Sequence, residues 1–183
     1  MIKINNPAVR FVVLFIPLII IWFTFYHYIY KIDLLISSNF DSLSYFSIIL
    51  SKQSNFILEI FGFITKTEIH GEHIVAKILN YEYTHGVWIG EPCNGIKIFG
   101  LFSIFIMCFK GSIKNKLWFI PLGVLILHLI NIIRIAILTY IAAINPNWLN
   151  FNHNITFQLI IYGAMLFLWL LWINKFYKIR NNE

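Results

Sequence analysis

The succession of apolar and polar stretches along this chain predicts four segments that can cross a lipid bilayer. A helix that spans the ~30 Å hydrocarbon layer needs about 20 predominantly apolar residues, with a lower limit near about 17. The second segment only just meets this length, so we expect it to start in the headgroup region. The four segments are residues 11–30, 93–109, 117–142 and 155–173.

The stretch between the first two spans is too long for a simple loop. Residues 43–64 are apolar but interrupted by polar side chains, which favours a helix lying in the membrane interface over a fifth span. The β-prone runs 74–79 and 86–89 predict a small hairpin. The predicted fold class is an all-α polytopic membrane protein with about four transmembrane helices, an interfacial amphipathic helix and a small β-hairpin on the outer side.

Composition supports the membrane assignment and excludes other classes. Of the 183 residues, 59% are hydrophobic and 12% are charged, and the mean hydropathy is +0.75. These values lie outside those of ordinary soluble proteins. The basic residues form no patch interleaved with aromatic residues, so we expect no nucleic-acid partner. We expect one compact domain over residues 1–183, with the lipid bilayer as its surroundings.

The charged residues predict an orientation in the membrane. Basic residues flank the spans on one side of a four-helix arrangement, and by the positive-inside rule that side is cytoplasmic. The segment 31–92 then faces outward, with four lysines and seven acidic residues, a net charge of −3. We divide the chain into an N-terminal span (1–30), this outer segment, a three-helix core (93–173) and a cytoplasmic tail (174–183). The flanking basic residues are Lys3, Arg10, Lys110, Lys114, Lys116, Lys175, Lys178 and Arg180.

Cys93 opens the second span in the run Glu-Pro-Cys-Asn-Gly-Ile at 91–96. Pro92 favours the first turn of a helix, because its missing N–H costs nothing there. The thiol would then lie among the free N–H groups of that turn, where the helix dipole favours an anion. A cysteine in that position can have a lowered pKa and act as a nucleophile. Cys108, in the same span, is expected to be a packing residue.

Three further polar residues are expected at the depth of Cys93. Asn131 and Arg134 are three residues apart and share one helix face. Arg134 lies about 25 Å along the third span, close to the outer boundary at which the second span begins. His153 lies in the short outer loop before the fourth span. Cys93, Arg134 and His153 each also have an ordinary alternative: the thiol packs, the arginine snorkels to headgroups and the histidine is solvated.

Together these groups would suit acyl transfer. A thiolate at Cys93 could attack a peptide carbonyl and form a thioester. His153 could take the thiol proton and return one to the leaving amine. Arg134 could stabilise the thiolate or the oxyanion, with Asn131 orienting Arg134 or the substrate.

At these residues the chain resembles the exosortase/archaeosortase family of membrane-embedded cysteine transpeptidases. The match rests on Cys-Asn-Gly-Ile at 93–96, Asn-Ile-Ile-Arg at 131–134 and His153 before the last span, and it covers residues 61–172. The compact size and the Glu-Pro-Cys-Asn-Gly form look most like the short exosortase F-type proteins of Bacteroidota. Many relatives have Ser where Asn94 stands, and larger ones carry additional N-terminal spans.

The resemblance implies roles and partners. Cys93 would be the nucleophile, Arg134 the transition-state stabiliser and His153 the acid/base, without a cofactor or a metal. The substrates would be tail-anchored exported proteins whose C-terminal signal combines a short motif, a hydrophobic helix and a basic tail. Cleavage near the motif would be followed by transfer to an acceptor molecule. The resemblance also implies a bacterial inner (cytoplasmic) membrane, with both termini cytoplasmic and the site facing the periplasm.

Two other functions stay open at this stage. His70, Glu72 and His73, with His85 and Glu91, offer ligands for a metal-dependent membrane hydrolase. Their spacing differs from a helical His-Glu-x-x-His site, so solvated loop histidines are the simpler interpretation. A non-enzymatic membrane scaffold or envelope-assembly subunit would also suit the aromatic-rich helices.

Overall fold

The computed structural model of the protein describes residues 7–36, 42–70, 73–81, 86–90, 93–109 and 111–177. Three helical stretches of this part are long and apolar enough to cross a membrane: Val9–Tyr28 within α1 (Pro7–Ile36), α4 (Ile113–Ile144), and Pro146–Phe176 around α6 (Phe157–Trp172). A further apolar helix, α3 (Ile96–Cys108), has only 13 residues. The chain is therefore a mostly helical membrane protein.

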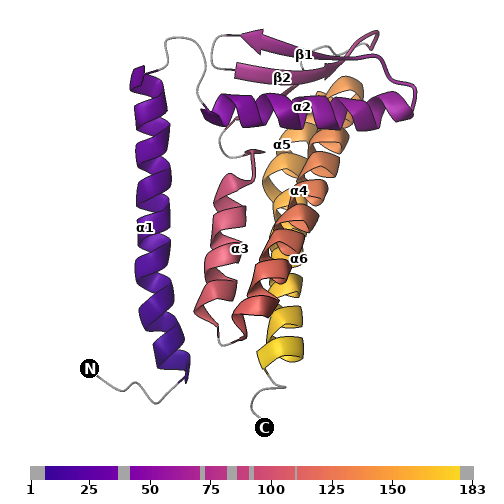
Figure 1. The fold of residues 1–183 in the computed structure, drawn as a ribbon. Coiled ribbons are helices and arrows are strands. Elements are labelled where there is room, and N and C mark those ends of the chain that lie inside the picture. The colour runs from indigo at the N-terminus through magenta and orange to yellow at the C-terminus, as the bar shows by residue number, and fades with distance from the viewer. Residues whose placement is uncertain are drawn as a thin grey trace.

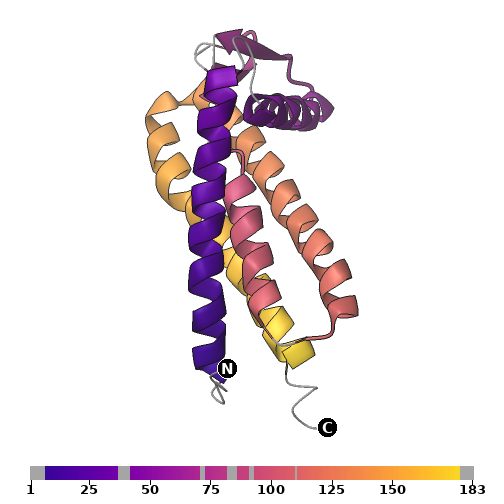
Figure 2. The same cartoon turned by 60° about the vertical axis from the view of Figure 1, so that its left-hand side comes forward.

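The long helices run side by side, and the other elements lie across one end of them. Figure 1 shows α1, α3, α4 and α6 in roughly one direction, with α2 (Ser42–Ile60) crossing their upper end. The strands lie beyond α2, and Figure 2 shows the same division from another side. This end is termed the sheet end. Helix α1 begins, and α6 ends, at the opposite end of the molecule.

Helix α2 has a buried face rich in small polar residues and an exposed face rich in large apolar ones. The exposed apolar residues Tyr45, Ile49, Phe56 and Ile60 are 61%, 49%, 64% and 67% accessible. This is the reverse of a helix on a soluble protein, and it suits contact with lipid. The location of α2 in the interface stays a prediction. Its buried residues are Ser47, Leu50, Ser51, Ser54, Asn55 and Leu58.

Helix α2 ends at Ile60, four residues before the predicted boundary. Gly62 adopts a left-handed conformation with φ 85°. The N–H of Phe63 donates to the carbonyl of Leu58 at 3.2 Å and that of Gly62 to Glu59 at 2.9 Å, the two bonds of a Schellman motif. The apolar run continues past this stop, which is why hydrophobicity alone placed the end too late.

The sheet has three antiparallel strands in the described chain: β1 (Thr65–His70), β2 (His73–Ile78) and β3 (Val87–Trp88), in the order β1-β2-β3. The pairing of β2 with β3 confirms the predicted hairpin. The strand β1 was not predicted, because its residues are mostly polar and give no apolar alternation. Glu68 on β1 bonds Lys77 of β2 at 2.6 Å and Lys66 at 3.2 Å. The hydrogen bond from Lys77 is the main reason that the pKa of Glu68 falls to about 2.

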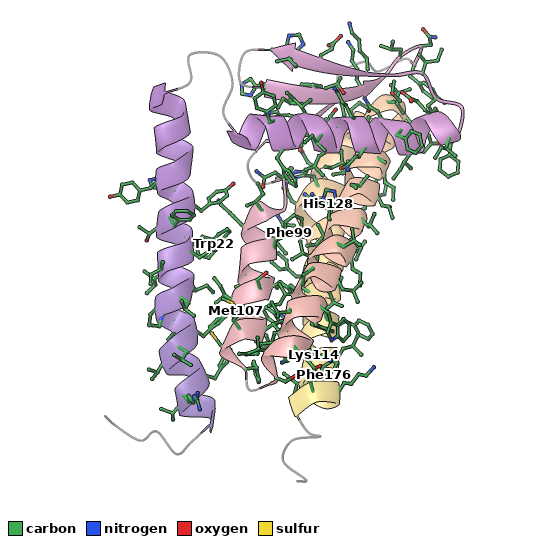
Figure 3. All side chains as sticks on the ribbon, in the orientation of Figure 1. Trp22, Phe99, Met107, Lys114, His128 and Phe176 are labelled. Atoms are coloured by element: carbon green, nitrogen blue, oxygen red, sulfur yellow. The ribbon has the colours of Figure 1, made fainter. Side chains whose placement is uncertain are left out.

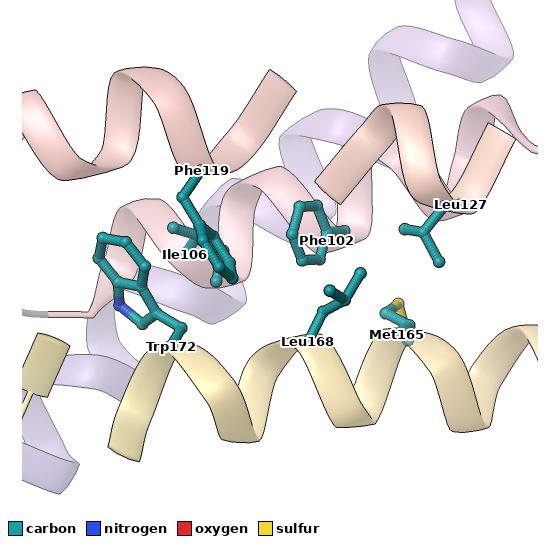
Figure 4. Packing of buried hydrophobic residues seen from close by; sticks show 7 residues of the cluster. All are labelled: Phe102, Ile106, Phe119, Leu127, Met165, Leu168 and Trp172. Carbon is teal, nitrogen blue, oxygen red and sulfur yellow. The ribbon is translucent and has the colours of Figure 1, made fainter. Parts of the chain in front are cut away.

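The main core joins α3, α4 and α6 in the half of the bundle away from the sheet. Figure 4 shows its side chains interdigitating between these three helices. Gly123 lets α4 approach α3, since a Cβ there would lie 2.2 Å from the Phe102 ring. Small residues allow such close packing between membrane helices, where van der Waals contact drives association. The buried members are Phe102, Ile106, Phe119, Leu127, Met165, Leu168 and Trp172.

Other helix boundaries also differ from the predicted ones. Helix α1 is longer at both ends than residues 11–30. Helix α4 begins at Ile113 instead of 117, because the Ser112 hydroxyl caps it by accepting from the N–H of Asn115 at 3.3 Å. Before α6 the chain is already helical, through η2 (Pro146–Trp148), α5 (Leu149–Phe151) and η3 (Asn152–Thr156). The predicted outer loop around His153 is therefore wrong, because this segment is a wide helical turn.

Candidate active site

The thiol of Cys93 lies in a short turn that leads into α3. The N–H of Cys93 donates to the carbonyl of Gly90 at 2.9 Å. Gly95 has φ 80°, and α3 starts only at Ile96. Cys93 thus precedes the first helical turn, in contrast to the prediction that it lies within it. Glu91 and Pro92 lie outside the described residues.

Gly95 is required by both its backbone and its neighbours. Its φ lies in the left-handed region, which glycine adopts without steric cost. A Cβ at this position would lie 3.1 Å from the Phe99 ring and 3.2 Å from Nδ2 of Asn131. The turn therefore places the Cys93 backbone directly against α4.

His153, in η3 before α6, brings its imidazole ring to the Cys93 thiol. Its Nε2 lies 3.0 Å from the Cys93 Sγ, and its Nδ1 lies 2.9 Å from the Asn154 Oδ1. In the tautomer with the ring proton on Nδ1, this nitrogen donates a hydrogen bond to the Asn154 amide oxygen. Nε2 is then the acceptor that faces the thiol, as a general base requires.

Helix α4 supplies the remaining polar groups. The Nδ2 of Asn131 donates to the Cys93 carbonyl at 2.9 Å, and its Oδ1 accepts from Nη1 of Arg134 at 3.5 Å. Nη2 of Arg134 lies 4.0 Å from the Cys93 Sγ. Asn131 thus connects the Cys93 backbone to the guanidinium group of Arg134. The structure brings together all four residues that the sequence singled out.

Arg134 is buried, and no carboxylate among the described residues pairs with its charge. It is 5% exposed, and its Nε has no hydrogen-bond partner. The ion pairs found among the described residues all involve Glu68 at the sheet end, and none involves Arg134. A buried cation without a counter-ion is costly. The buried guanidinium group therefore favours a negative charge that develops on or beside the sulfur.

Apolar residues surround the thiol of Cys93. Cys93 is 5% exposed and packs with Leu50 of α2, Ile89 after β3, and Ile132 and Ile135 of α4. The thiol lies outside the membrane-spanning helices, and its burial raises its pKa, which the nearby Arg134 guanidinium offsets only in part. The expected lowering of the thiol pKa is therefore wrong for the resting state, because desolvation outweighs the nearby positive charge.

Sequence reasoning missed two residues near Cys93. Tyr26, near the end of the first predicted span, is 3% exposed, and its hydroxyl oxygen lies 3.4 Å from the Asn94 amide nitrogen. His128 packs against the rings of Phe46 and Phe99, and its Nδ1 is buried without a partner. Figure 3 shows His128 and Phe99 just below α2. An ionisable residue inside an apolar span, three positions before Asn131, was the available signal for His128.

The residues of the metal-site alternative lie at the sheet end. His70 and His73 are paired at the end of the β1–β2 ladder, and His70 contacts Glu68 at 3.3 Å. Glu72, His85 and Glu91 fall outside the described residues. In the portion of the chain that is described, no three metal-binding side chains gather. Cys108 is half-buried and, like Cys93, a free thiol.

Comparison with known proteins gives a match to one family model. The sequence model described as Transmembrane exosortase (Exosortase_EpsH) matches residues 9–174. Neither a curated protein nor a solved structure shows a match to the chain. The family match includes most of α1, the elements of the sheet end and the helices α3, α4 and α6, and the chain therefore belongs to the transmembrane exosortase family.

Proposed function

We propose that this protein is a membrane-embedded cysteine transpeptidase that cleaves the C-terminal sorting signal of exported proteins. The observation that carries the proposal is the 3.0 Å contact between the Cys93 Sγ and the His153 Nε2. It lies beside a buried guanidinium group without a carboxylate partner, in the part of the chain that the structure describes. Membership of a sorting-related membrane family supports the same conclusion.

The first half-reaction forms a thioester. As the Cys93 Sγ attacks the carbonyl carbon of the scissile peptide bond, its proton moves to Nε2 of His153. The carbonyl oxygen becomes an oxyanion, and Arg134 stabilises this charge. When the intermediate collapses, the C–N bond breaks and the leaving amine takes the proton from His153. The exported protein then remains attached to Cys93 through its new C-terminal carbonyl.

The second half-reaction restores the thiol. His153 removes a proton from the acceptor nucleophile, which attacks the thioester carbon beside Arg134. The C–S bond breaks, and the proton on His153 returns to the sulfur. The apolar surroundings of Cys93 limit access of water, which favours transfer over hydrolysis. Asn131 holds the Cys93 carbonyl and orients Arg134 throughout.

We also propose the membrane setting. The basic flanks place both termini in the cytoplasm, with the sheet end at the periplasmic face of a bacterial inner membrane. Helix α3 then acts as a short fourth span beside α1, α4 and α6. The substrates are tail-anchored exported proteins with a short motif, a hydrophobic helix and a basic tail, and the acceptor is an envelope molecule. The Glu-Pro-Cys-Asn-Gly run at 91–95 supports assignment to the short F-type proteins of Bacteroidota.

The test is processing of a tail-anchored reporter by variants that still insert into the membrane. Cys93→Ala, Arg134→Ala and His153→Ala should each lower the processing rate by roughly 100-fold or more, as loss of a nucleophile, oxyanion donor or general base does. Cys108→Ala is the matched control and should retain the wild-type rate. Mass spectrometry should find the reporter joined to Cys93. Retained processing in all three variants would end the peptidase proposal.

A further inference from the structure

Tyr26 is a buried polar residue on a helix that is otherwise largely exposed. On α1, its neighbours Phe25 and Tyr28 are 55% and 58% exposed, whereas Tyr26 is 3% exposed. Its hydroxyl oxygen lies 3.4 Å from the Nδ2 of Asn94, which can donate to it. Asn94 directly follows Cys93, so this contact joins the N-terminal helix to the nucleophile turn.

The height of Tyr26 is set by packing along α1 and α3. A Cβ on Gly100 would lie 2.1 Å from the Trp22 ring, so the two helices meet closely at this point. Figure 3 shows Trp22 projecting from α1 toward α3. Away from the sheet end, the ring of Phe11 lies 5.3 Å from Phe105. Contacts at both levels restrict sliding of α1, and they keep the Tyr26 hydroxyl opposite Asn94.

Asn94 uses both ends of its amide. Its Oδ1 accepts from the N–H of Ile96 at 3.0 Å, which satisfies a free donor at the start of α3. Its Nδ2 faces Tyr26 at 3.4 Å. Asn94 is 1% exposed, so solvent cannot readily replace its hydrogen-bond partners. A change in its orientation would alter the turn that carries the Cys93 sulfur.

We infer that Tyr26 is a positioning residue for the nucleophile, acting through Asn94. This inference rests on the proposed function of Cys93. The Tyr26 hydroxyl touches neither the thiol nor His153, so it does not take part in the proton transfers. It holds the amide that shapes the turn, and with it the alignment of the sulfur with Nε2 of His153. Small errors in such alignment reduce the rate of the chemical step while leaving substrate binding unchanged.

The positioning role of Tyr26 can be tested by comparing substitutions at two tyrosines of α1. Tyr26→Phe removes the hydroxyl but keeps the ring, over which the Lys97 ammonium lies at 5.1 Å. Tyr28→Phe is the matched control, because Tyr28 is exposed on α1. In Tyr26→Phe, kcat for the reporter should fall roughly 2- to 10-fold with KM unchanged, the effect of losing one neutral hydrogen bond. In Tyr28→Phe both should match the wild type.

A second measurement separates positioning from general damage. In a Cys108→Ala background Cys93 is the only thiol, and its alkylation by iodoacetamide reports on the turn without any substrate. Tyr26→Phe should change this rate, and it should add little to Asn94→Ala in the double variant, because the two residues act as one unit. A wild-type alkylation rate and kcat in Tyr26→Phe, or full additivity with Asn94→Ala, would overturn the inference. Absence of processing by the wild type would instead overturn the proposed function.

Discussion

At the residue scale, the resting site is best described as a neutral thiol that faces the imidazole ring of His153. Desolvation raises the pKa of Cys93, and the Arg134 charge offsets this only in part. If the ring proton of His153 lies on Nδ1 beside the Asn154 Oδ1, Nε2 is the acceptor that faces the thiol. In the proposed reaction, nucleophilic attack and proton transfer would then be concerted, and Arg134 would act mainly on the charge that appears during the reaction.

This description predicts the pH dependence of thiol alkylation. A raised pKa means that the thiolate is scarce at neutral pH and gains population only above the range of an ordinary cysteine. In a Cys108→Ala protein, the rate of Cys93 alkylation should therefore rise with an inflection above that of free cysteine measured in parallel. Arg134→Met should move the inflection further upward, because it removes the positive charge. An inflection below the free-cysteine value would show a thiolate–imidazolium pair at rest and contradict this description.

At the scale of single elements, α2 covers the thiol of Cys93. Leu50 is fully buried against Cys93 and Ile132, while Ile49 on the same helix is 49% exposed. The same helix offers apolar residues to its surroundings and small polar residues to the protein interior. A substrate peptide that reaches the sulfur must therefore displace part of α2 or pass along its edge.

Because α2 covers the thiol, we expect substitutions at two neighbouring residues of α2, Ile49 and Leu50, to differ in their effect on the rate of Cys93 modification. Leu50→Ala should raise the rate at which a bulky maleimide modifies Cys93 several-fold, because it opens space above the sulfur. Ile49→Ala should leave the rate unchanged. The melting temperature of each variant, measured in detergent, shows whether a faster reaction merely reflects unfolding. Equal maleimide rates for both variants and the wild type would show that α2 does not shield the thiol.

Most of the helices and the polar residues of the site could be predicted from the sequence. Strand β1 and the burial of Tyr26 could not. Apolar length and positive charge identify α1, α4 and α6, and spacing puts Asn131 beside Arg134. Strand β1 escaped because partnering with β2, and not its own composition, makes it a strand. Tyr26 escaped because an aromatic residue near a membrane boundary usually anchors to headgroups. Its burial depends on the packing of α1 against α3, which no local pattern encodes.

At the scale of the whole molecule, the proposed orientation can be tested with single cysteines in a protein whose two native cysteines are alanine. Lys66→Cys lies on β1, where the lysine side chain is 57% exposed, and Lys114→Cys lies near the start of α4 at the opposite end. An impermeant maleimide should label Lys66→Cys in intact spheroplasts and Lys114→Cys only after permeabilisation. The reverse labelling pattern would contradict the proposed orientation and show that the sheet end faces the cytoplasm.

Two contacts at each end of α3 fix the position of Cys93 along the helix bundle. At one end, the Phe109 and Phe11 ring centroids lie 4.6 Å apart, and the Phe109 carbonyl accepts from the Lys116 ammonium at 2.6 Å. At the other end, Asn94 meets Tyr26, and the carbonyl of Cys93 meets Asn131. Both α1 and α4 advance 15 residues between these levels, about 22 Å at ~1.5 Å per residue. The 13 residues of α3 give a similar ~20 Å.

This length falls short of a ~30 Å hydrocarbon layer by several ångströms. Hydrophobic mismatch of this size is met by thinning of the adjacent leaflet or by a dip of water toward the short helix. A peptide bond cleaved at Cys93 would therefore have to be pulled below the headgroup plane, out of its own aqueous segment. The bilayer beside α3 would then be locally deformed, and the thickness of the host membrane would influence how readily a substrate reaches the sulfur.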